Sequence, residues 1–227
     1  MAQILALDTS TDACSVALQS DVGKFDRFEI APRQHTHLIL PMVEAVLSEA
    51  QLGVMDLDLI AFGRGPGSFA GIRIATGAAQ GLALAYETPV VGVSTLEAMA
   101  WRALEEAPNS QFILAALDAR MDEVYWCTYE VQNGNPSALH EERVSAPSDV
   151  SLEVQGPCTL AGSGVTYLRD RAAIQTRAQR SLPEVYPVAR IMIKIAEREL
   201  IAGRVLKPEE AQPLYLREGT WKKRGEQ

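Results

Sequence analysis

The chain has 227 residues, enough for one large core or two modest ones, and 47% of them are hydrophobic, which is ordinary for a globular protein. Its formal net charge of -8 weighs against autonomous nucleic-acid binding, which usually shows a basic patch. No apolar stretch reaches the roughly 18 residues of a membrane span, and a strand pattern begins at once, without a signal peptide. The 3 cysteines are odd in number and widely spaced, which argues against a disulfide framework. We therefore expect a cytoplasmic protein.

The first half of the chain opens with three strands and then alternates helices and strands. Alternating or continuous apolar residues predict strands, and apolar residues at helical spacing predict helices. The expected elements are strands at 3–8, 14–19 and 25–30, a helix at 36–51, a strand at 57–62, a helix at 69–86, a strand at 89–93 and a helix at 95–106. Ser94 or Thr95 is the expected N-cap of the last helix.

The second half starts in the same way. Asn133-Gly134 is a strong hairpin signal, Pro187 suits the first turn of a helix, and Gly203 suits its end. The expected elements are strands at 112–117, 123–131 and 139–144, a strand at 158–161, a helix to about 173, a helix after Pro187 and a short apolar segment at 213–217 that should dock.

The repeated order predicts an α/β fold of two lobes, the second abbreviated. We place the first lobe at residues 1–106 and the second at 107–182. Residues 183–227 form a C-terminal helix and tail that we expect to pack back on the first lobe, although the pattern itself leaves the choice of lobe open.

The helix at 69–86 has no polar face. Arg73 is its one charged side chain, and the Gly77-x-x-x-Gly81 spacing lets another helix come close. The helix is either a central core helix or one that packs on its own sheet and on a partner. The helix at 36–51 is similarly apolar, and Pro41 should bend it or mark its first turn. The side chains expected to contact a partner are Leu38, Met42, Ala45, Val46, Ile72, Ile74, Ala75, Ala78, Ala79 and Leu82.

Polar and glycine-rich turns follow several predicted strands, where ligands of open α/β sheets gather. Hydroxyls there suit a phosphate, Asp8 suits a hydrated magnesium ion, and a glycine turn before a helix suits an anion. Each turn alone is equally a structural one, and neither standard phosphate motif is present. Together they suggest a nucleotide cleft between the lobes, working or inherited, with the candidates Asp8, Thr9, Ser10, Gly65, Gly67, Ser68, Asp118, Gly162 and Gly164.

Other catalytic or binding patterns are weak. Around the histidines His35, His37 and His140, no acid or cysteine completes a tidy set of metal ligands, and no serine or cysteine sits in a nucleophile elbow. One basic cluster, Lys222-Lys223-Arg224 beside Trp221, is either a solvated end or an RNA contact.

Four stretches resemble the TsaB family: Ile4-Leu5-Ala6-Leu7-Asp8-Thr9-Ser10, Gly65-Pro66-Gly67-Ser68-Phe69-Ala70-Gly71-Ile72-Arg73, Asp118-Ala119-Arg120 and Tyr215-Leu216-Arg217. The resemblance covers nearly the whole chain. It implies the two-lobed, ribonuclease H-like duplication of actin, sugar kinases and Hsp70. It also implies a non-catalytic role in the synthesis of threonylcarbamoyladenosine in tRNA.

Comparison with the catalytic paralogue TsaD supports that role. The paralogue holds its metal with His-x-x-x-His, and the matching positions here are Thr95 and Met99. A threonine lacks the ligating nitrogen, and a thioether is too soft for iron(II), magnesium or zinc. The resemblance implies no metal site, no required cofactor, and at most weak or vestigial ATP or ADP binding.

The resemblance also implies partners. TsaD should form a heterodimer through the helices near 36–51 and 69–86, and the ATPase TsaE should join that pair. Alone, the chain should form a homodimer, with tRNA contacted mostly indirectly and no membrane contact. The alternative is a nucleotide-dependent transferase or kinase, active in its own right, that uses Asp8, Asp118 and the Gly162 turn.

Overall fold

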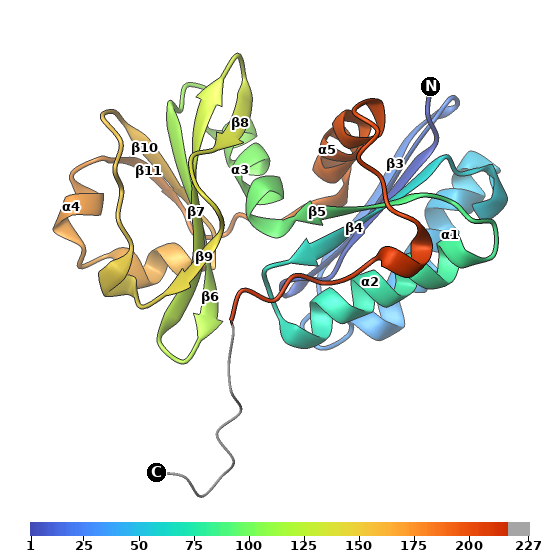
Figure 1. Cartoon of the computed structure of the whole chain (residues 1–227), viewed down its shortest axis with the longest axis horizontal. Coiled ribbons are helices and arrows are strands. Elements are labelled where there is room, and N and C mark those ends of the chain that lie inside the picture. The colour runs from blue at the N-terminus through green and yellow to red at the C-terminus, as the bar shows by residue number, and fades with distance from the viewer. Residues whose placement is uncertain (218–227) are drawn as a thin grey trace, which may run out of the picture.

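The computed structural model describes residues 1–217, which form two α/β lobes side by side (Figure 1). The first lobe is built on a five-stranded sheet in the order β3-β2-β1-β4-β5. Its strands are β1 (Ile4–Asp8), β2 (Ala13–Ser20), β3 (Gly23–Ile30), β4 (Leu59–Gly65) and β5 (Val90–Ser94). β1 pairs antiparallel with β2 and parallel with β4, so it lies at the centre of the sheet.

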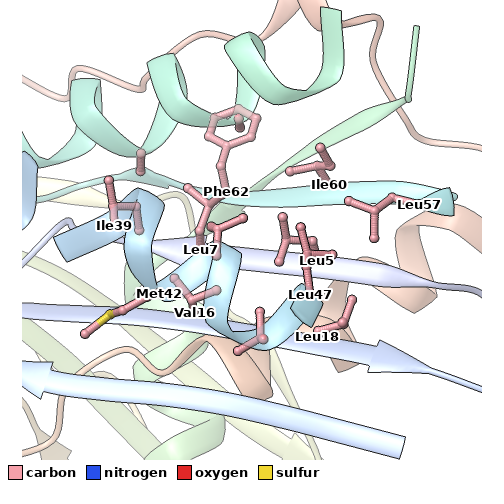
Figure 2. Packing of buried hydrophobic residues seen from close by; sticks show 14 of the residues in the cluster. Leu5, Leu7, Val16, Leu18, Ile39, Met42, Leu47, Leu57, Ile60 and Phe62 are labelled. Carbon is pink, nitrogen blue, oxygen red and sulfur yellow. The ribbon is translucent and has the colours of Figure 1, made fainter. Parts of the chain in front are cut away.

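The central strand β1 is buried on both faces, which explains its continuous apolar sequence. Leu5 and Leu7 face α1 (His35–Ala50) and α2 (Phe69–Leu84) on one side of the sheet. Ile4 and Ala6 face α5 (Ala189–Ile201) on the other side. In Figure 2 the first of these cores lies between the strands and the helices that cover them.

The second lobe repeats the topology of the first. Its main strands are β6 (Phe112–Arg120), β7 (Glu123–Gln132), β8 (Asn135–Ala138), β10 (Cys158–Ala161) and β11 (Ala178–Leu182). In the order β8-β7-β6-β10-β11 they match the first sheet strand for strand, in direction as well as in position. The two-lobed duplication is therefore confirmed. The lobe is abbreviated because only β9 (Arg143–Ser145) and a short turn occupy the place of α1.

Each lobe is completed by a helix from the other half of the chain. α3 (Thr95–Glu106) follows the first sheet, yet its Leu96, Met99 and Ala103 pack with residues of the second sheet. α5 follows the second sheet, yet Met192 and Ile195 pack on the first. The C-terminal helix thus lies on the first lobe. The lobe boundaries at 106 and 182 stay predictions about folding units, because each sheet completes its core with a helix from the other half.

The structure corrects four details of the predicted elements. Pro41 does not mark the first turn of α1, which begins at His35; it lies on the exposed side of the helix, as does His37, whose carbonyl loses its donor. The strand predicted at 139–144 is displaced: residues 135–138 and 143–145 form the paired strands β8 and β9, and Glu142, in the segment between them, pairs with Arg64 of the first lobe. The helix predicted to about 173 is instead a 3₁₀ segment, Ser163–Leu168, and the short α4 (Ala172–Gln175). Strand β11 was not predicted, and its side chains are mostly exposed.

The local turn signals hold except at Pro187, which precedes Val188, the N-cap of α5, and so lies outside the first turn of that helix. Asn133 and Gly134 form the β7–β8 hairpin with φ of 51° and 75°, as a two-residue turn of this type requires. Ser94 caps α3 by accepting a hydrogen bond from Glu97 N, and Gly203 follows α5 with φ of 68°. Within residues 1–217, no helix combines the length and the hydrophobicity that crossing a bilayer demands.

Candidate functional site

The Asp8-Thr9-Ser10 turn is locked against the glycine turn that precedes α2. Thr9 Oγ1 donates to Gly71 O at 2.6 Å, and Ser68 N donates to Ser10 O at 2.7 Å. Ser10 donates through both its backbone N and its Oγ to Asp8 Oδ1, at 3.0 and 2.9 Å. Both hydroxyl protons of the turn are therefore used inside the protein.

Two glycines allow this close packing. A Cβ atom at Gly67 would lie 2.3 Å from Ser10 O, and one at Gly71 would lie 2.0 Å from Thr9 O. Real Cβ atoms do not come this close to backbone oxygens, so any other residue would push the two turns apart. The glycine signature thus has a packing role, and Gly71 belongs with the predicted residues although it was not among them.

Asp8 is a buried carboxyl with one free oxygen. Its side chain is 1% exposed, and Oδ2 has no hydrogen-bond partner within residues 1–217. Burial raises the pKa of Asp8 from 3.8 to about 6, and the hydrogen bonds from Ser10 oppose this shift. Burial therefore penalises the ionised form of Asp8 relative to an exposed aspartate.

The second lobe holds the other group of predicted residues. Asp118 N donates to Ser163 Oγ at 3.2 Å, and Asp118 Oδ1 accepts from Arg120 N at 2.7 Å. The backbone of Gly162 and Gly164 lies directly against that of β6. The structure thus gathers the predicted cleft residues into two groups, one in each lobe. Gly65 and Ser68 belong to the first group.

The two positions that the resemblance matches to metal ligands, Thr95 and Met99, lie on α3. Thr95 is its first residue and is fully buried. The Met99 methyl group lies 2.0 Å from where a Cβ at Gly162 would stand, so the thioether fills the space at the end of β10. Among residues 1–217, no three His, Cys, Asp or Glu side chains lie close enough together to hold a metal ion.

His140 has a structural environment. Its ring packs edge-on against Trp126 with centroids 4.9 Å apart. Its Nε2 accepts from Thr128 N at 3.3 Å, and Nδ1 lies 2.7 Å from Glu141 O, which assigns the proton to Nδ1. Backbone groups occupy both nitrogens, so the imidazole has no lone pair left for a metal.

Half of the predicted partner contacts belong to the chain's own core. Met42, Val46, Ala75 and Ala79 are buried between the first sheet and its helices, and Ile72 is buried as well. A buried side chain cannot touch a partner while the helix stays in place, so these five are corrected to core residues. The other five, which are half-buried, are Leu38, Ala45, Ile74, Ala78 and Leu82.

The face of α2 that meets solvent carries almost no charge. Ala70, Arg73, Gly77, Gly81 and Leu84 are exposed and recur every three or four residues, which places them on one stripe. A Cβ at Gly77 or Gly81 would meet open space. This set is named the α2 stripe below. The sequence signal was the glycine spacing, but the list of contacts omitted the glycines themselves.

A shallow apolar groove lies beside the α2 stripe. It has a volume of about 400 Å³, and Leu82 of α2 lines one wall. The remaining lining comes from α1 and the segment after it: Leu40, Val43, Glu44, Leu47, Ser48, Leu52, Gly53 and Val54. Groove and stripe together form one apolar face across α1 and α2.

The C-terminal segment docks as predicted. Leu214 N donates to Arg64 O at 2.7 Å, and the Tyr215 ring lies 6.0 Å from that of Phe69. The Arg73 guanidinium lies 3.3 Å from the centroid of the Phe69 ring. The basic cluster at Trp221–Arg224 lies outside the described residues.

Comparisons with known proteins agree on one family. The family model of TsaD, tRNA N6-adenosine threonylcarbamoyltransferase, matches residues 29–187. The tRNA threonylcarbamoyladenosine biosynthesis protein TsaB of Escherichia coli (strain K12) is 41% identical over 226 residues, 97% of each chain. TsaB of Haemophilus influenzae is 38% identical over 97% of this chain and 96% of its own.

Solved structures show the same relationship. YeaZ from Pseudomonas aeruginosa superposes with a TM-score of 0.89 at 40% identity, over 95% of this chain and 100% of its own. A second Pseudomonas aeruginosa structure, described as similar to peptidase YEAZ, gives the same TM-score and identity over 96% of this chain. Long, nearly full-length matches to TsaB relatives, together with the duplicated fold, confirm the resemblance found in the sequence. The chain belongs to the TsaB family of tRNA threonylcarbamoyladenosine biosynthesis proteins.

Proposed function

We propose that this protein is a non-catalytic scaffold for threonylcarbamoyl transfer to the adenosine next to the anticodon of tRNA. It binds and activates a TsaD-type transferase through the apolar face of α1 and α2, and the ATPase TsaE joins that pair. It needs no cofactor of its own, forms a homodimer when alone, and contacts tRNA mostly through its partner. Its three unpaired, buried cysteines suit the reducing cytoplasm.

The observation that carries the proposal is the α2 stripe. An exposed helix normally presents charged or polar side chains to water, and this one presents Gly77, Gly81, Ala70 and Leu84. Glycines in an exposed helix cost about 1 kcal/mol each relative to alanine, so their presence favours a role in close contact. A partner helix lying on this stripe would approach the α2 backbone closely, and the neighbouring groove would receive its apolar side chains.

Two observations favour a partner over an enzyme. Where TsaD has metal-binding histidines, this chain has a helix N-terminus and a thioether packed in the core. In the first lobe, the hydroxyls suited to a phosphate donate to Gly71 O and to Asp8 Oδ1 instead. A nucleotide would have to break these hydrogen bonds to bind in the inherited place.

The interface is tested by two substitutions at one position. Gly81→Arg adds length and charge to the α2 stripe in open space, so the monomer should stay folded while affinity for TsaD falls at least about tenfold, or 1.4 kcal/mol. Gly81→Ala should raise the free energy of unfolding by about 0.5–1 kcal/mol, because alanine is the better helix former. Calorimetric titration with TsaD and urea unfolding supply the two readouts.

The matched control is Ala173→Arg, which adds the same charge to an exposed helical position of the second lobe. It should leave TsaD binding unchanged. Full affinity of a folded Gly81→Arg variant would show that the partner binds elsewhere.

The alternative, a transferase or kinase active by itself, is tested with ATP and magnesium. The isolated chain should bind ATP weakly or not at all in calorimetry and should release no ADP. Steady ATP turnover that is lost in Asp8→Asn and Asp118→Asn variants would overturn the scaffold proposal. Peptide-bond cleavage by the isolated chain would do the same.

A further inference from the structure

A buried carboxylate links the two lobes near the strand ends. Glu142 belongs to the second lobe, between β8 and β9, and its side chain is only 11% exposed. Ser94 Oγ, at the end of β5 in the first lobe, donates to this carboxylate. Arg64 Nη2, at the end of β4, lies 3.3 Å from its second oxygen. These three residues are called the Glu142 clasp below.

The C-terminal segment forms a second link, which starts on the first lobe. Gln80 Nε2, on α2, donates to Pro208 O and Ala211 O at 3.1 and 3.2 Å. Farther along, Leu214 N donates to Arg64 O. Figure 1 shows this red segment running from α2 toward the end of β6. Residues 211–217 are called the strap.

The strap ends on the second lobe, where Arg217 holds the turn between β6 and β7. Its Nη2 donates to Ala119 O at 3.1 Å and to Arg120 O at 3.4 Å, and it pairs with Glu123. The last residue of β6 and both residues of this turn have left-handed backbone angles, with φ of 63°, 56° and 57° for Arg120, Met121 and Asp122. Consecutive non-glycine residues in this region are unfavourable, so contacts from outside help to keep the turn in shape.

Both links meet at Arg64. Its guanidinium pairs with Glu142, and its carbonyl accepts from the strap. Gly65 follows it directly, and Asp118 lies two residues before Arg120, at the end of β6 that Arg217 holds. The links therefore cross between the same strand ends that the sequence predicts as a nucleotide cleft.

We propose that the chain ties its own lobes together across these strand ends, so that the clasp and the strap set the spacing of the lobes without a bridging ligand. Side chains and backbone of the protein take the place that a nucleotide between two lobes would fill. The two lobes then form one stiff body. The proposal rests on these contacts alone and stands whether or not the α2 stripe binds TsaD.

The spacing of the lobes is measured with spin labels on the full chain. Ser48→Cys on α1 and Ser148→Cys on the second lobe give one exposed cysteine on each, whereas the native cysteines are all buried and should stay unlabelled. Electron–electron double resonance should give one narrow distance distribution. Addition of ATP with magnesium should leave it unchanged.

Breaking both links should release the lobes. The Glu142→Gln, Arg217→Ala double substitution should broaden the distribution and lengthen its mean, while Arg217→Lys, which keeps the charge but not the fork of donors, should give a smaller change. The matched control carries Glu141→Gln and Arg177→Ala, whose side chains are exposed; Arg177 donates within the second lobe, to Ala173 O. It should match the parent.

The proposal fails if the folded double variant keeps the parent distribution, because α3 and α5 alone would then set the spacing. It also fails if ATP narrows the distribution of the parent. Circular dichroism and a thermal melt establish that each variant is folded. Should the double variant unfold, Arg217→Lys and Glu142→Gln are compared singly, and an unchanged distribution in both overturns the proposal.

Discussion

Ile195→Ala should lower the free energy of unfolding by about 2–5 kcal/mol, the usual cost of removing a large buried aliphatic side chain. Ile195 is 2% exposed on the face of α5 that packs on the first sheet. Its removal leaves a cavity against a sheet whose own helices cover only the opposite face. Urea unfolding, followed by circular dichroism, measures the change.

Ile201→Ala is the matched control. It makes the same chemical change on the same helix, but Ile201 is 84% exposed. The free energy of unfolding should therefore change by no more than about 0.5 kcal/mol. Equal effects at the two positions would mean that α5 does not pack on the first sheet as described. A larger loss of unfolding free energy at Ile195 than at Ile201 supports the packing of α5 on the first sheet.

Asp8→Asn should gain stability relative to the parent as the pH rises. The folded-state pKa of Asp8, about 6, lies above the ordinary value of 3.8, because burial penalises the charge. The parent therefore loses stability as the pH rises from 3.8 through 6, since only the unfolded chain ionises freely there. A pKa shift of this size corresponds to a loss of about 3 kcal/mol in the free energy of unfolding. The Asp8→Asn variant cannot ionise at this position, so it does not undergo that loss.

The measurement compares urea unfolding of both proteins at about pH 4 and about pH 8. Since the unfolded chain is already partly ionised at about pH 4, the difference in unfolding free energy between variant and parent should move by about 2.4 kcal/mol in favour of the variant. Asp8→Ala, which also cannot ionise, should show the same movement from a lower starting value, because it lacks the acceptor for Ser10. Parallel pH curves for parent and variants would show that Asp8 titrates normally.

Local signals in the sequence predicted the elements well. The continuous apolar run of β1 and the Asn133-Gly134 hairpin depend on neighbouring residues alone, so both predictions are confirmed. The strand predicted at 139–144 was only partly right, for a different reason. Residues 143–145 pair with β7, but Glu142 just before them contacts Arg64 and Ser94 in the first lobe, and no periodicity within the segment shows that contact.

Predictions about surface residues were less complete, because they also depend on contacts that the local sequence does not show. The apolar excess of α1 and α2 was visible, but Ala75 and Ala79 turned out to face the sheet, while Gly77 and Gly81 face solvent. Both sets are small and uncharged. Composition alone therefore cannot tell a core position from an exposed one on such a helix.

The sequence by itself determined the duplicated order of strands, the glycine turn before α2 and the family, because these follow from local patterns and from residues that stand next to one another. Only the tertiary structure decided that α3 packs on the second sheet and α5 on the first. It also decided that the hydroxyls of Thr9 and Ser10 donate within the protein, and that Arg217 reaches the turn after β6. Each of these joins segments far apart in the chain. Their partners are chosen by packing and distance, which no local pattern records.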